Sequence, residues 1–349
     1  MKILALDLGK SKSAVCVLDT AEMKERYMTI ATTPFALVNL LEREHPDRVV
    51  FEVGTLAGWV HDVVVGQGCA VQVANPNHEG WRWRNVKRKT DRLDALKLGR
   101  LSAAGQLPTV HMPAASVREH RALIQYRTQL VGRRTRIKNT IRSMIARQGR
   151  KMAVGGSAWT RKELAALQEW SRPWDQIERS EDLWRGQLHE ELTALEQIEQ
   201  QLLRLERKLD ALGRGDQRIV RLQTIPCVGA RTAEMLVAVL DDPHRFKSLK
   251  EVGSYVGLTP RQFQSGQMDR SGGISKQGHR QLRRMLVEVS WLALRYNPYL
   301  RSIYLRVCRG IASRRKIAIV AVARKLLVIA WAMLRDGTAW RPRAACTAA

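Results

Sequence analysis

Leucine recurs every seven residues in the middle of the chain, and a second apolar residue follows three positions later. The repeat consists of Leu188, Leu195, Leu202 and Leu209, with Ile198, Leu205 and Leu212 at the second position. An apolar seam that lasts more than three heptads and is flanked by Glu, Gln, Arg and Lys predicts a long packed helix. Its partner helix can belong to the same chain or to a second copy, and the pattern is the same in both cases.

The segments around this helix are also mainly helical. Residues 116–148 form one long helical pattern with a strongly cationic face, whereas residues 151–180 contain glycines and Pro173 and predict an irregular connection. From residue 216 the sequence predicts helices with short breaks at glycines. We therefore expect a basic helix, a connection and a coiled-coil helix over residues 116–215, a mainly α domain over 216–340 and a frayed tail over 341–349.

The first 115 residues have a different pattern. Short apolar segments rich in β-branched residues come first with tight turns between them and then alternate with helical segments. Such an order is typical of a mixed sheet covered by helices. The sequence thus predicts an α/β N-terminal domain over residues 1–115, followed by the helical coiled-coil segment and the mainly α C-terminal domain.

The charge balance indicates a polyanionic partner. Lys and Arg total 59 against 33 Asp and Glu, which gives a formal net charge of +26. Nucleic acid is favoured over an anionic membrane, because neutralised phosphates release counterions and no segment resembles a basic amphipathic anchor. Five cysteines, scattered singly and with no CxxC pair, fit a reducing compartment. The N-terminus has no signal-peptide pattern, and Arg324 and Lys325 interrupt the most apolar C-terminal segment, so we expect a cytoplasmic protein without a membrane span.

Four acids form the first candidate site. Asp7 ends the first predicted strand and Glu52 ends a later one, while Asp91 and Asp94 begin a helix after the last strand. A single acid at the end of an apolar strand is more often a cap or an ion-pair partner. Strand ends meet at one edge of a sheet, however, and clustered carboxylates repel unless hard cations lie between them, so all four acids together predict a Mg²⁺ site with one or two ions.

Basic residues next to these acids predict contacts with a nucleic-acid backbone. They are Lys87, Arg88 and Lys89, and Trp81 and Trp83 nearby could stack on bases or serve the core. A second feature, "IPCVGARTA", has the outline of a helix-hairpin-helix, in which backbone N–H groups at a helix start bind a phosphate. Gly229 and Thr232 would form that contact edge, although an ordinary turn between helices fits the spacing equally well.

A glycine-rich segment contains the third candidate, Ser265. The sequence "GLTPRQFQSGQMDRSGGISKQGHRQLRR" predicts a flexible loop followed by a basic helix. A serine in a loop usually has no special role. Here the surrounding basic residues could hold a phosphate next to a hydroxyl nucleophile; those expected to contact nucleic acid are Arg261, Lys276, Arg283 and Arg284.

In this order, the acids, the "KTDRLDA" block, "IPCVGARTA" and the serine segment resemble the DEDD insertion-sequence transposases of the one-hundred-and-ten family. The resemblance covers nearly the whole chain. It implies an RNase H-like domain of the RuvC type that binds Mg²⁺ through Asp7, Glu52, Asp91 and Asp94. It also implies that Ser265 attacks DNA to form a covalent 5′-phosphoserine.

The resemblance further implies partners. These are target and donor DNA, a non-coding bridge RNA made by the element, and further copies of the chain in a dimer or tetramer, with the acids of one subunit facing the serine of another. The chain departs from the family at Cys227-Val228-Gly229, where relatives often have Gly-Ile-Gly, and in "VGTLAGWV" after Glu52. Guide or DNA contacts of those loops therefore do not carry over directly.

Three other functions fit parts of the sequence. An actin-like ATPase or sugar kinase would use "LALDLGKSKSAV" to hold phosphate, but it needs a second Asp-x-Gly turn after a later strand. The later candidate, "RDGTAW", follows a helical pattern instead. A non-catalytic nucleic-acid-binding protein would need the basic helices alone. A RuvC-like nuclease would cut with metal-activated water and would leave Ser265 unused.

Overall fold

The computed structural model describes residues 1–76, 90–265 and 268–342, and the chain divides into two compact units, Met1–Arg118 and Glu119–Ala349. The predicted Lys87, Arg88 and Lys89 contacts lie outside the described residues. An α/β first part followed by a helical second part confirms the predicted fold class. The finer boundaries at residues 115, 215 and 340 stay predictions.

Unit 1 is built on a five-stranded mixed sheet with the strand order β3-β2-β1-β4-β5. Its strands are β1 (Lys2–Asp7), β2 (Lys12–Asp19), β3 (Lys24–Ala31), β4 (Arg48–Glu52) and β5 (Ala70–Ala74). β1 pairs antiparallel with β2 and parallel with β4, and β4 pairs parallel with β5. β1 and β4 thus lie inside the sheet, which explains why their apolar runs are buried on both faces.

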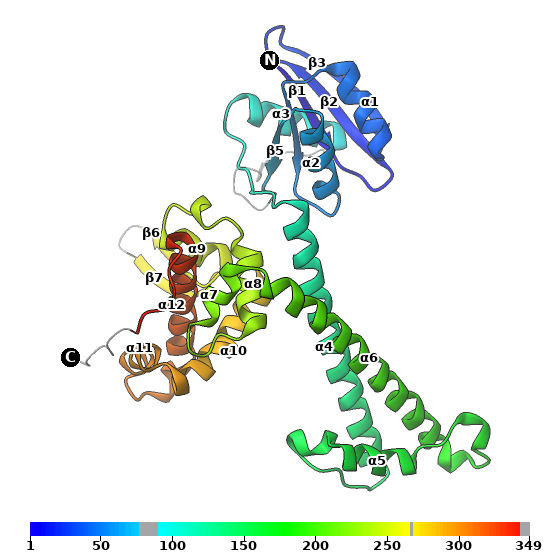
Figure 1. The fold of residues 1–349 in the computed structure, drawn as a ribbon. Helices are drawn as coiled ribbons and strands as arrows, with labels where there is room; N and C mark the ends of the chain where they lie inside the picture. The colour runs from blue at the N-terminus through cyan, green and yellow to red at the C-terminus, as the bar shows by residue number, and fades with distance from the viewer. Residues whose placement is uncertain (77–89, 266–267, 343–349) are drawn as a thin grey trace. The chain divides into compact units, whose positions relative to one another are not determined.

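Helices cover both faces of this sheet (Figure 1). On one face, Leu4 and Leu6 of β1 pack with α1 (Pro34–Glu44) and α2 (Ala57–Gly66). On the other face, Ile3 and Ala5 pack with α3 (Asp91–Ala103). Successive residues of β1 therefore alternate between two apolar layers, as the two-residue period of a strand requires.

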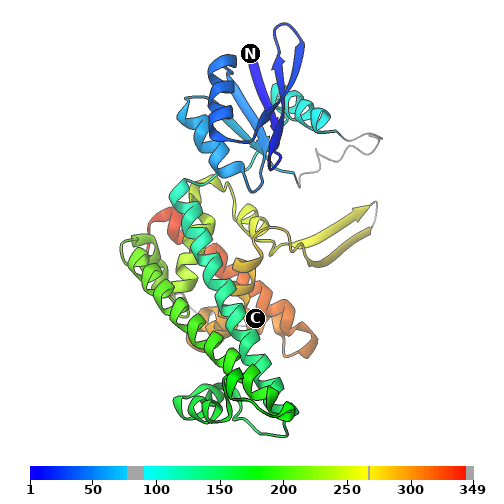
Figure 2. The ribbon, with the colours of Figure 1, turned by 90° about the vertical axis from the view of Figure 1, so that its right-hand side faces the viewer.

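The predicted heptad helix is α6 (Leu183–Arg214), and its partner within the described chain is α4 (Ala115–Arg147). Leu188 and Leu195 pack against the last turns of α4, and Leu202 and Leu209 against its earlier part, so the two helices run antiparallel (Figure 2). Lys138 of α4 pairs with Glu199 of α6 at 3.1 Å between Nζ and Oε1. The seam thus closes within one chain, except that Leu212 at its end is 43% exposed.

The connection between α4 and α6 is more regular than the sequence prediction of an irregular segment. It contains α5 (Arg161–Trp170), which begins where the Thr160 hydroxyl accepts a hydrogen bond from the Glu163 N–H at 3.4 Å. Leu167 of α5 is buried with Leu188 against the end of α4. Burial of Leu167 stabilises α5, a short helix that lies between Gly156 and Pro173.

The remainder of unit 2 is a helical core that carries one small two-stranded sheet. Its helices are α7 (Gln217–Gln223), α8 (Ala230–Leu240), α9 (Leu249–Val256), α10 (Arg280–Tyr296), α11 (Pro298–Cys308) and α12 (Arg315–Asp336). The stretch Ala312–Asp336, which includes α12, is long and apolar enough to cross a membrane. Of its most apolar window, 61% is buried inside the protein, and its apolar residues belong to the same core as those of α7 to α11. α12 is thus a core helix of unit 2.

Candidate functional site

Asp7 and Glu52 end two neighbouring parallel strands. The register of β1 and β4 pairs Leu6 with Phe51, and Asp7 and Glu52 are the next residues along the two strands. Both acids are partly buried. The strand pairing therefore places the ends of β1 and β4 at the same edge of the sheet, as predicted.

The two acids also share a face of the sheet. Ala5 of β1 and Val50 of β4 pack in the apolar layer under α3. Asp7 and Glu52 are two residues beyond them, and alternate residues of a strand have the same direction. Asp7 and Glu52 therefore belong to the face that α3 covers.

Asp91 and Asp94 lie in the first turn of α3, as the sequence predicted. The Thr90 hydroxyl caps this helix by accepting the Leu93 N–H at 3.3 Å, and carboxylates in a first turn are stabilised by the helix dipole. Leu98, seven residues after Asp91 and four after Asp94, packs against the sheet. Residues at this spacing share one side of a helix, so both acids are on the side of α3 that carries Leu98. Asp94 is partly buried there, and Asp91 is exposed.

The donor types in this region suit a hard divalent cation, because Mg²⁺ prefers carboxylate oxygens. Two of the four acids come from the sheet face that α3 covers, and the other two come from the side of α3 that carries Leu98. Within residues 1–76, 90–265 and 268–342, no three His, Cys, Asp or Glu side chains lie close enough together to hold a metal ion. Coordination by all four acids stays a prediction.

The segment around Ser265 is a β-hairpin and not the flexible loop expected from its glycines. It consists of β6 (Pro260–Ser265) and β7 (Met268–Ile274), which project from the helices of unit 2 (Figure 2). Ser265 is the last residue of β6 and pairs with Met268. The signal that sequence reasoning overlooked is the pair Gly-Gln at 266–267, because glycine followed by another residue is a common two-residue connection between hairpin strands.

Backbone contacts fix the base of this hairpin to the helical core. Gly257 and Gly278 have φ angles of +74° and +83°, and a Cβ at Gly278 would lie only 1.9 Å from the carbonyl oxygen of Tyr255. The Ser275 N–H donates to the Thr259 carbonyl at 2.8 Å across the base. At the base of the hairpin the backbone at Gly278 therefore lies so close to the backbone at Tyr255 that only glycine fits.

The four basic residues predicted to contact nucleic acid around Ser265 have different surroundings. Arg283 donates from Nη1 to the carbonyls of Val256 at 2.8 Å and Gln277 at 3.3 Å, which ties both arms of the hairpin base to α10, and burial lowers the pKa of its guanidinium. Arg261 donates to the Ser275 carbonyl at 3.3 Å. The remaining two, Lys276 and Arg284, are exposed.

The predicted phosphate-binding turn lies between α7 and α8. Gly229 is exposed at the N-cap of α8, while Thr232 is only 7% exposed and its N–H donates to the Gly229 carbonyl at 3.0 Å. Cys227 has a φ of +88°, and burial raises the pKa of its thiol to about 12. A thiol with this pKa is protonated at neutral pH and is no nucleophile.

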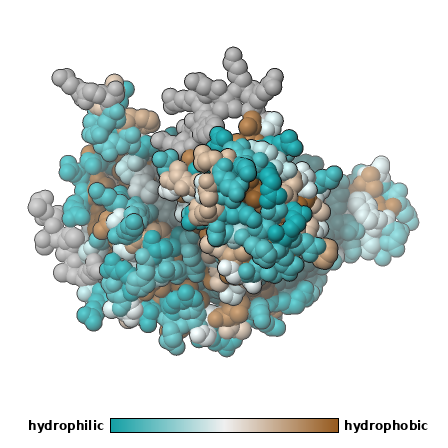
Figure 3. Space-filling model, turned by 90° about the horizontal axis from the view of Figure 1, so that it is seen from above, coloured by the Kyte–Doolittle hydropathy of each residue, from teal (hydrophilic) through white to brown (hydrophobic). Residues whose placement is uncertain are grey.

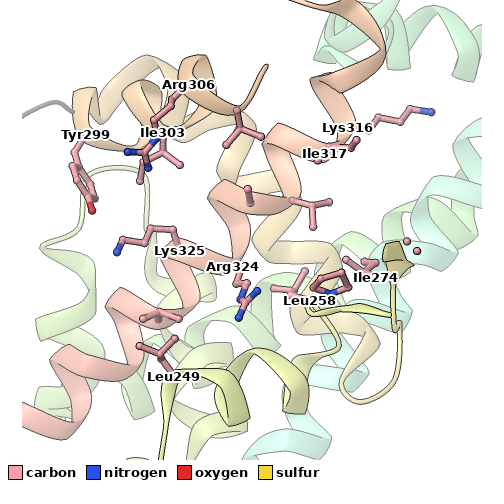
Figure 4. Close-up of a pocket in the computed structure, with 17 residues that line it drawn as sticks. Leu249, Leu258, Ile274, Tyr299, Ile303, Arg306, Lys316, Ile317, Arg324 and Lys325 are labelled. Atoms are coloured by element: carbon pink, nitrogen blue, oxygen red, sulfur yellow. The ribbon is translucent and has the colours of Figure 1, made fainter. Parts of the chain in front are cut away.

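A cavity of about 960 Å³ lies at the base of the hairpin between β6, β7, α9, α11 and α12 (Figure 4). Its wall is mainly aliphatic, with Leu258, Ile274 and Ile303 among its residues. It also carries four cations and no carboxylate: Arg306, Lys316, Arg324 and Lys325. This site was missed by sequence reasoning, because its residues come from elements separated by up to 79 positions that only tertiary packing joins.

Hydrophilic residues cover most of the face seen in Figure 3, and hydrophobic ones form scattered patches. With a net charge of +26, such a surface is compatible with binding a polyanion. Among the described residues, Arg127, Lys138, Arg118 and several other cations pair with carboxylates, but the cations of the cavity do not.

Comparison with known families adds an independent finding. Residues 4–173 match a family model described as "Transposase", and residues 220–305 match one described as "Transposase IS116/IS110/IS902 family". The first match contains all four acids and the second contains Ser265.

Individual relatives agree with these matches. The chain is 30% identical to a probable family 20 transposase of Pseudomonas aeruginosa over 259 residues, which cover 73% of this chain and 75% of the relative. It is 26% identical to the transposase for insertion sequence element IS1111A of Coxiella burnetii, over 98% of this chain and 92% of the relative. A Thermus thermophilus RuvC structure in complex with a Holliday junction substrate aligns over 32% of this chain and all of its own, with 14% identity and a TM-score of 0.24.

An acid-bearing α/β unit followed by a helical unit with a serine hairpin, in a chain with these matches, defines a transposase. The chain belongs to the IS116/IS110/IS902 family of insertion-sequence transposases. The resemblance found in the sequence is thereby confirmed, and the ATPase and sugar-kinase alternative is wrong.

Proposed function

We propose that this transposase cuts and rejoins DNA through a covalent 5′-phosphoserine at Ser265. The observation that carries the proposal is the position of Ser265 at the end of β6 in a projecting hairpin, next to exposed basic residues and within the region that matches the family. A hairpin that projects from the helical core can bring the end of β6 to a DNA backbone.

The reaction balances without an external energy source. The Ser265 hydroxyl attacks the scissile phosphorus and loses its proton, the bond from phosphorus to the 3′-oxygen breaks, and that oxygen takes up a proton. The 5′-phosphate stays on the serine as an ester. A 3′-hydroxyl of another strand then attacks this ester, which forms the new phosphodiester and returns the proton to Ser265.

Asp7, Glu52, Asp91 and Asp94 would hold Mg²⁺ in this reaction. The ion would neutralise charge that develops on the phosphate. Basic side chains around the hairpin would orient the backbone and offset the same charge, with exposed Lys276 and Arg284 as the candidates for direct contact. Arg283 would act through the hairpin, because its guanidinium already fixes the two arms.

The partners proposed are target and donor DNA, a bridge RNA made by the element, and a second copy of the chain, in the cytoplasm at the nucleoid. Two observations support them. The net charge of +26 suits polyanionic partners such as DNA and RNA, and the acids belong to unit 1 whereas Ser265 belongs to unit 2. A site assembled from acids of one subunit and the serine of another would make the dimer essential for chemistry.

A strand-cleavage assay tests this proposal. Purified chain, Mg²⁺, the flanking non-coding RNA and labelled target and donor DNA would be compared for the wild type, Ser265→Ala, Asp91→Ala and the control Ser271→Ala from the opposite strand of the hairpin. We expect a DNA-linked protein band in the wild type and in Ser271→Ala only. Cut DNA without a linked band, which survives Ser265→Ala but not Asp91→Ala, would instead establish a water-using nuclease.

A further inference from the structure

We propose that one face of the β6–β7 hairpin binds DNA by stacking on a base near the site of strand joining. Phe263 is the stacking residue, and Met268 lies beside it. The inference rests on the proposed role of Ser265 only for its place in the reaction. The stacking surface itself is argued from the hairpin.

The strand register divides the hairpin residues between two faces. Phe263 pairs with Arg270 and position 265 pairs with Met268, whereas Gln262 pairs with Ser271 and Gln264 with Asp269. Cross-strand partners share a face, and neighbouring residues along a strand have opposite faces. One face therefore comprises positions 263, 265, 268 and 270.

Hydrogen bonds on the other face support this division. The Gln262 side chain donates to Asp269 Oδ1 at 3.3 Å, and the Gln264 side chain donates to Asp269 Oδ2 at 3.2 Å. Asp269 is the only acid in the sequence of the hairpin, residues 260–274. Its carboxylate is thus held among amides on the face opposite Phe263.

The face that carries Phe263 exposes two large apolar side chains. Phe263 is 60% exposed and Met268 is 50% exposed, although such side chains gain most when they are buried. Gly272 lies beside the ring, where a Cβ would be 3.6 Å from Phe263 Cε2, so Gly272 itself places no side chain against the ring. An aromatic ring in this position is open to a flat partner.

Charge complementarity identifies that partner as nucleic acid. Arg270 pairs with Phe263 on the same face, and Arg261 lies beside the same flank, since a Cβ at Gly272 would also be 3.6 Å from Arg261 Cβ. Aromatic rings that alternate with cations are the pattern of proteins that stack on bases and contact the phosphates between them. An acidic protein surface would use the cations but would gain nothing specific from the ring.

The cavity at the base of the hairpin continues this cationic path. Pro260, Gly272 and Gly273 of the hairpin form part of its wall, and Arg324 and Lys325 of α12 and Arg306 of α11 form another part (Figure 4). From Pro260 to Phe263 the strand rises by roughly 10 Å. A DNA backbone that meets these cations can therefore reach Phe263 within a few nucleotides.

Fluorescence of a base analogue tests the stacking directly. The full-length protein would be titrated into a DNA duplex with 2-aminopurine opposite an abasic site, and into the matched, fully paired duplex. We expect quenching and preferential binding of the first duplex, because an unpaired base costs little to stack on protein. Phe263→Ala should lower that affinity by about five- to hundredfold, which is the range found when a stacking aromatic is truncated.

Matched variants make the result specific. Gln264→Ala, the next residue on the opposite face, should keep the preference, while Phe263→Trp should keep both the preference and the quenching. Met268→Ala should weaken it less than Phe263→Ala. Because the assay needs no strand cleavage, a failure of the serine chemistry would leave it unaffected.

Three results would overturn the inference. The first is equal binding of the two duplexes by the wild type, and the second is an unchanged preference in Phe263→Ala. The third is a loss of self-association in Phe263→Ala with DNA affinity unaltered, measured by sedimentation, which would assign the face to a second copy of the chain.

Discussion

Replacing Gly278 with alanine tests how the serine hairpin is anchored. A Cβ at this position would lie 1.9 Å from the Tyr255 carbonyl oxygen and 2.9 Å from its carbon, and the residue has a φ of +83°. Adopting the left-handed conformation costs a residue other than glycine about 1–2 kcal/mol. Displacing a packed backbone costs about 1–3 kcal/mol more.

Gly310→Ala is the matched control for this substitution. Gly310 has a φ of +72° and nothing within 4 Å of its ideal Cβ, so its replacement should cost only the conformational strain. We expect the difference of about 1–3 kcal/mol to lower the melting temperature of Gly278→Ala by a further 2–12 °C or so, since unit 2 is a large domain. Circular dichroism at 222 nm on the full chain would measure it. Equal melting temperatures for the two variants would refute the close approach at the hairpin base.

Two further predictions concern the coiled coil and the start of α10. Leu209→Ala should destabilise unit 2 by about 2–5 kcal/mol because Leu209 is fully buried against α4. Leu212 is exposed in the same heptad pattern, so Leu212→Ala should change the free energy of unfolding by no more than about 0.5 kcal/mol. Urea unfolding would measure both, and equal losses of stability would contradict the pairing of α6 with α4. His279 accepts the Leu282 N–H on Nδ1, and burial together with Arg121 and Arg283 lowers the pKa of its imidazole. The neutral form is thus favoured on folding, and its contribution to stability should be present above about pH 6.5 and be lost as the pH falls through the lower folded pKa. In His279→Asn the free energy of unfolding, measured by urea denaturation, should change less between pH 7 and 5.5 than in the wild type. An unchanged dependence on pH would contradict this role of His279.

Local patterns account for what the sequence predicted well. The apolar runs that end at Asp7 and Glu52 predicted the strands, and the leucine repeat predicted α6, because two-residue and seven-residue periods need no knowledge of the tertiary fold. The face on which Asp7 lies is a different matter. Since β1 is buried on both faces, alternation alone cannot tell which helix covers that acid, and only the pairing with β4 and the packing of α3 decide it.

Tertiary contacts account for what the sequence did not predict. The glycines around Ser265 were interpreted as a flexible loop, but Gly257 and Gly278 serve a close backbone approach that fixes a hairpin. The cavity at the hairpin base combines Leu249 with Val328, which no local pattern relates. For α5, a signal was present in Thr160 and Glu163, three residues apart in the spacing of a capping box.

Mass spectrometry of the trapped complex tests most directly whether Ser265 becomes bonded to DNA. After protease and nuclease digestion of the wild-type complex, we expect one tryptic peptide with a 5′-linked nucleotide phosphate on Ser265, formed only with Mg²⁺ present and absent from Asp91→Ala. A nucleotide on another residue, or DNA cut to free 5′-phosphate ends with no modified peptide, would contradict it.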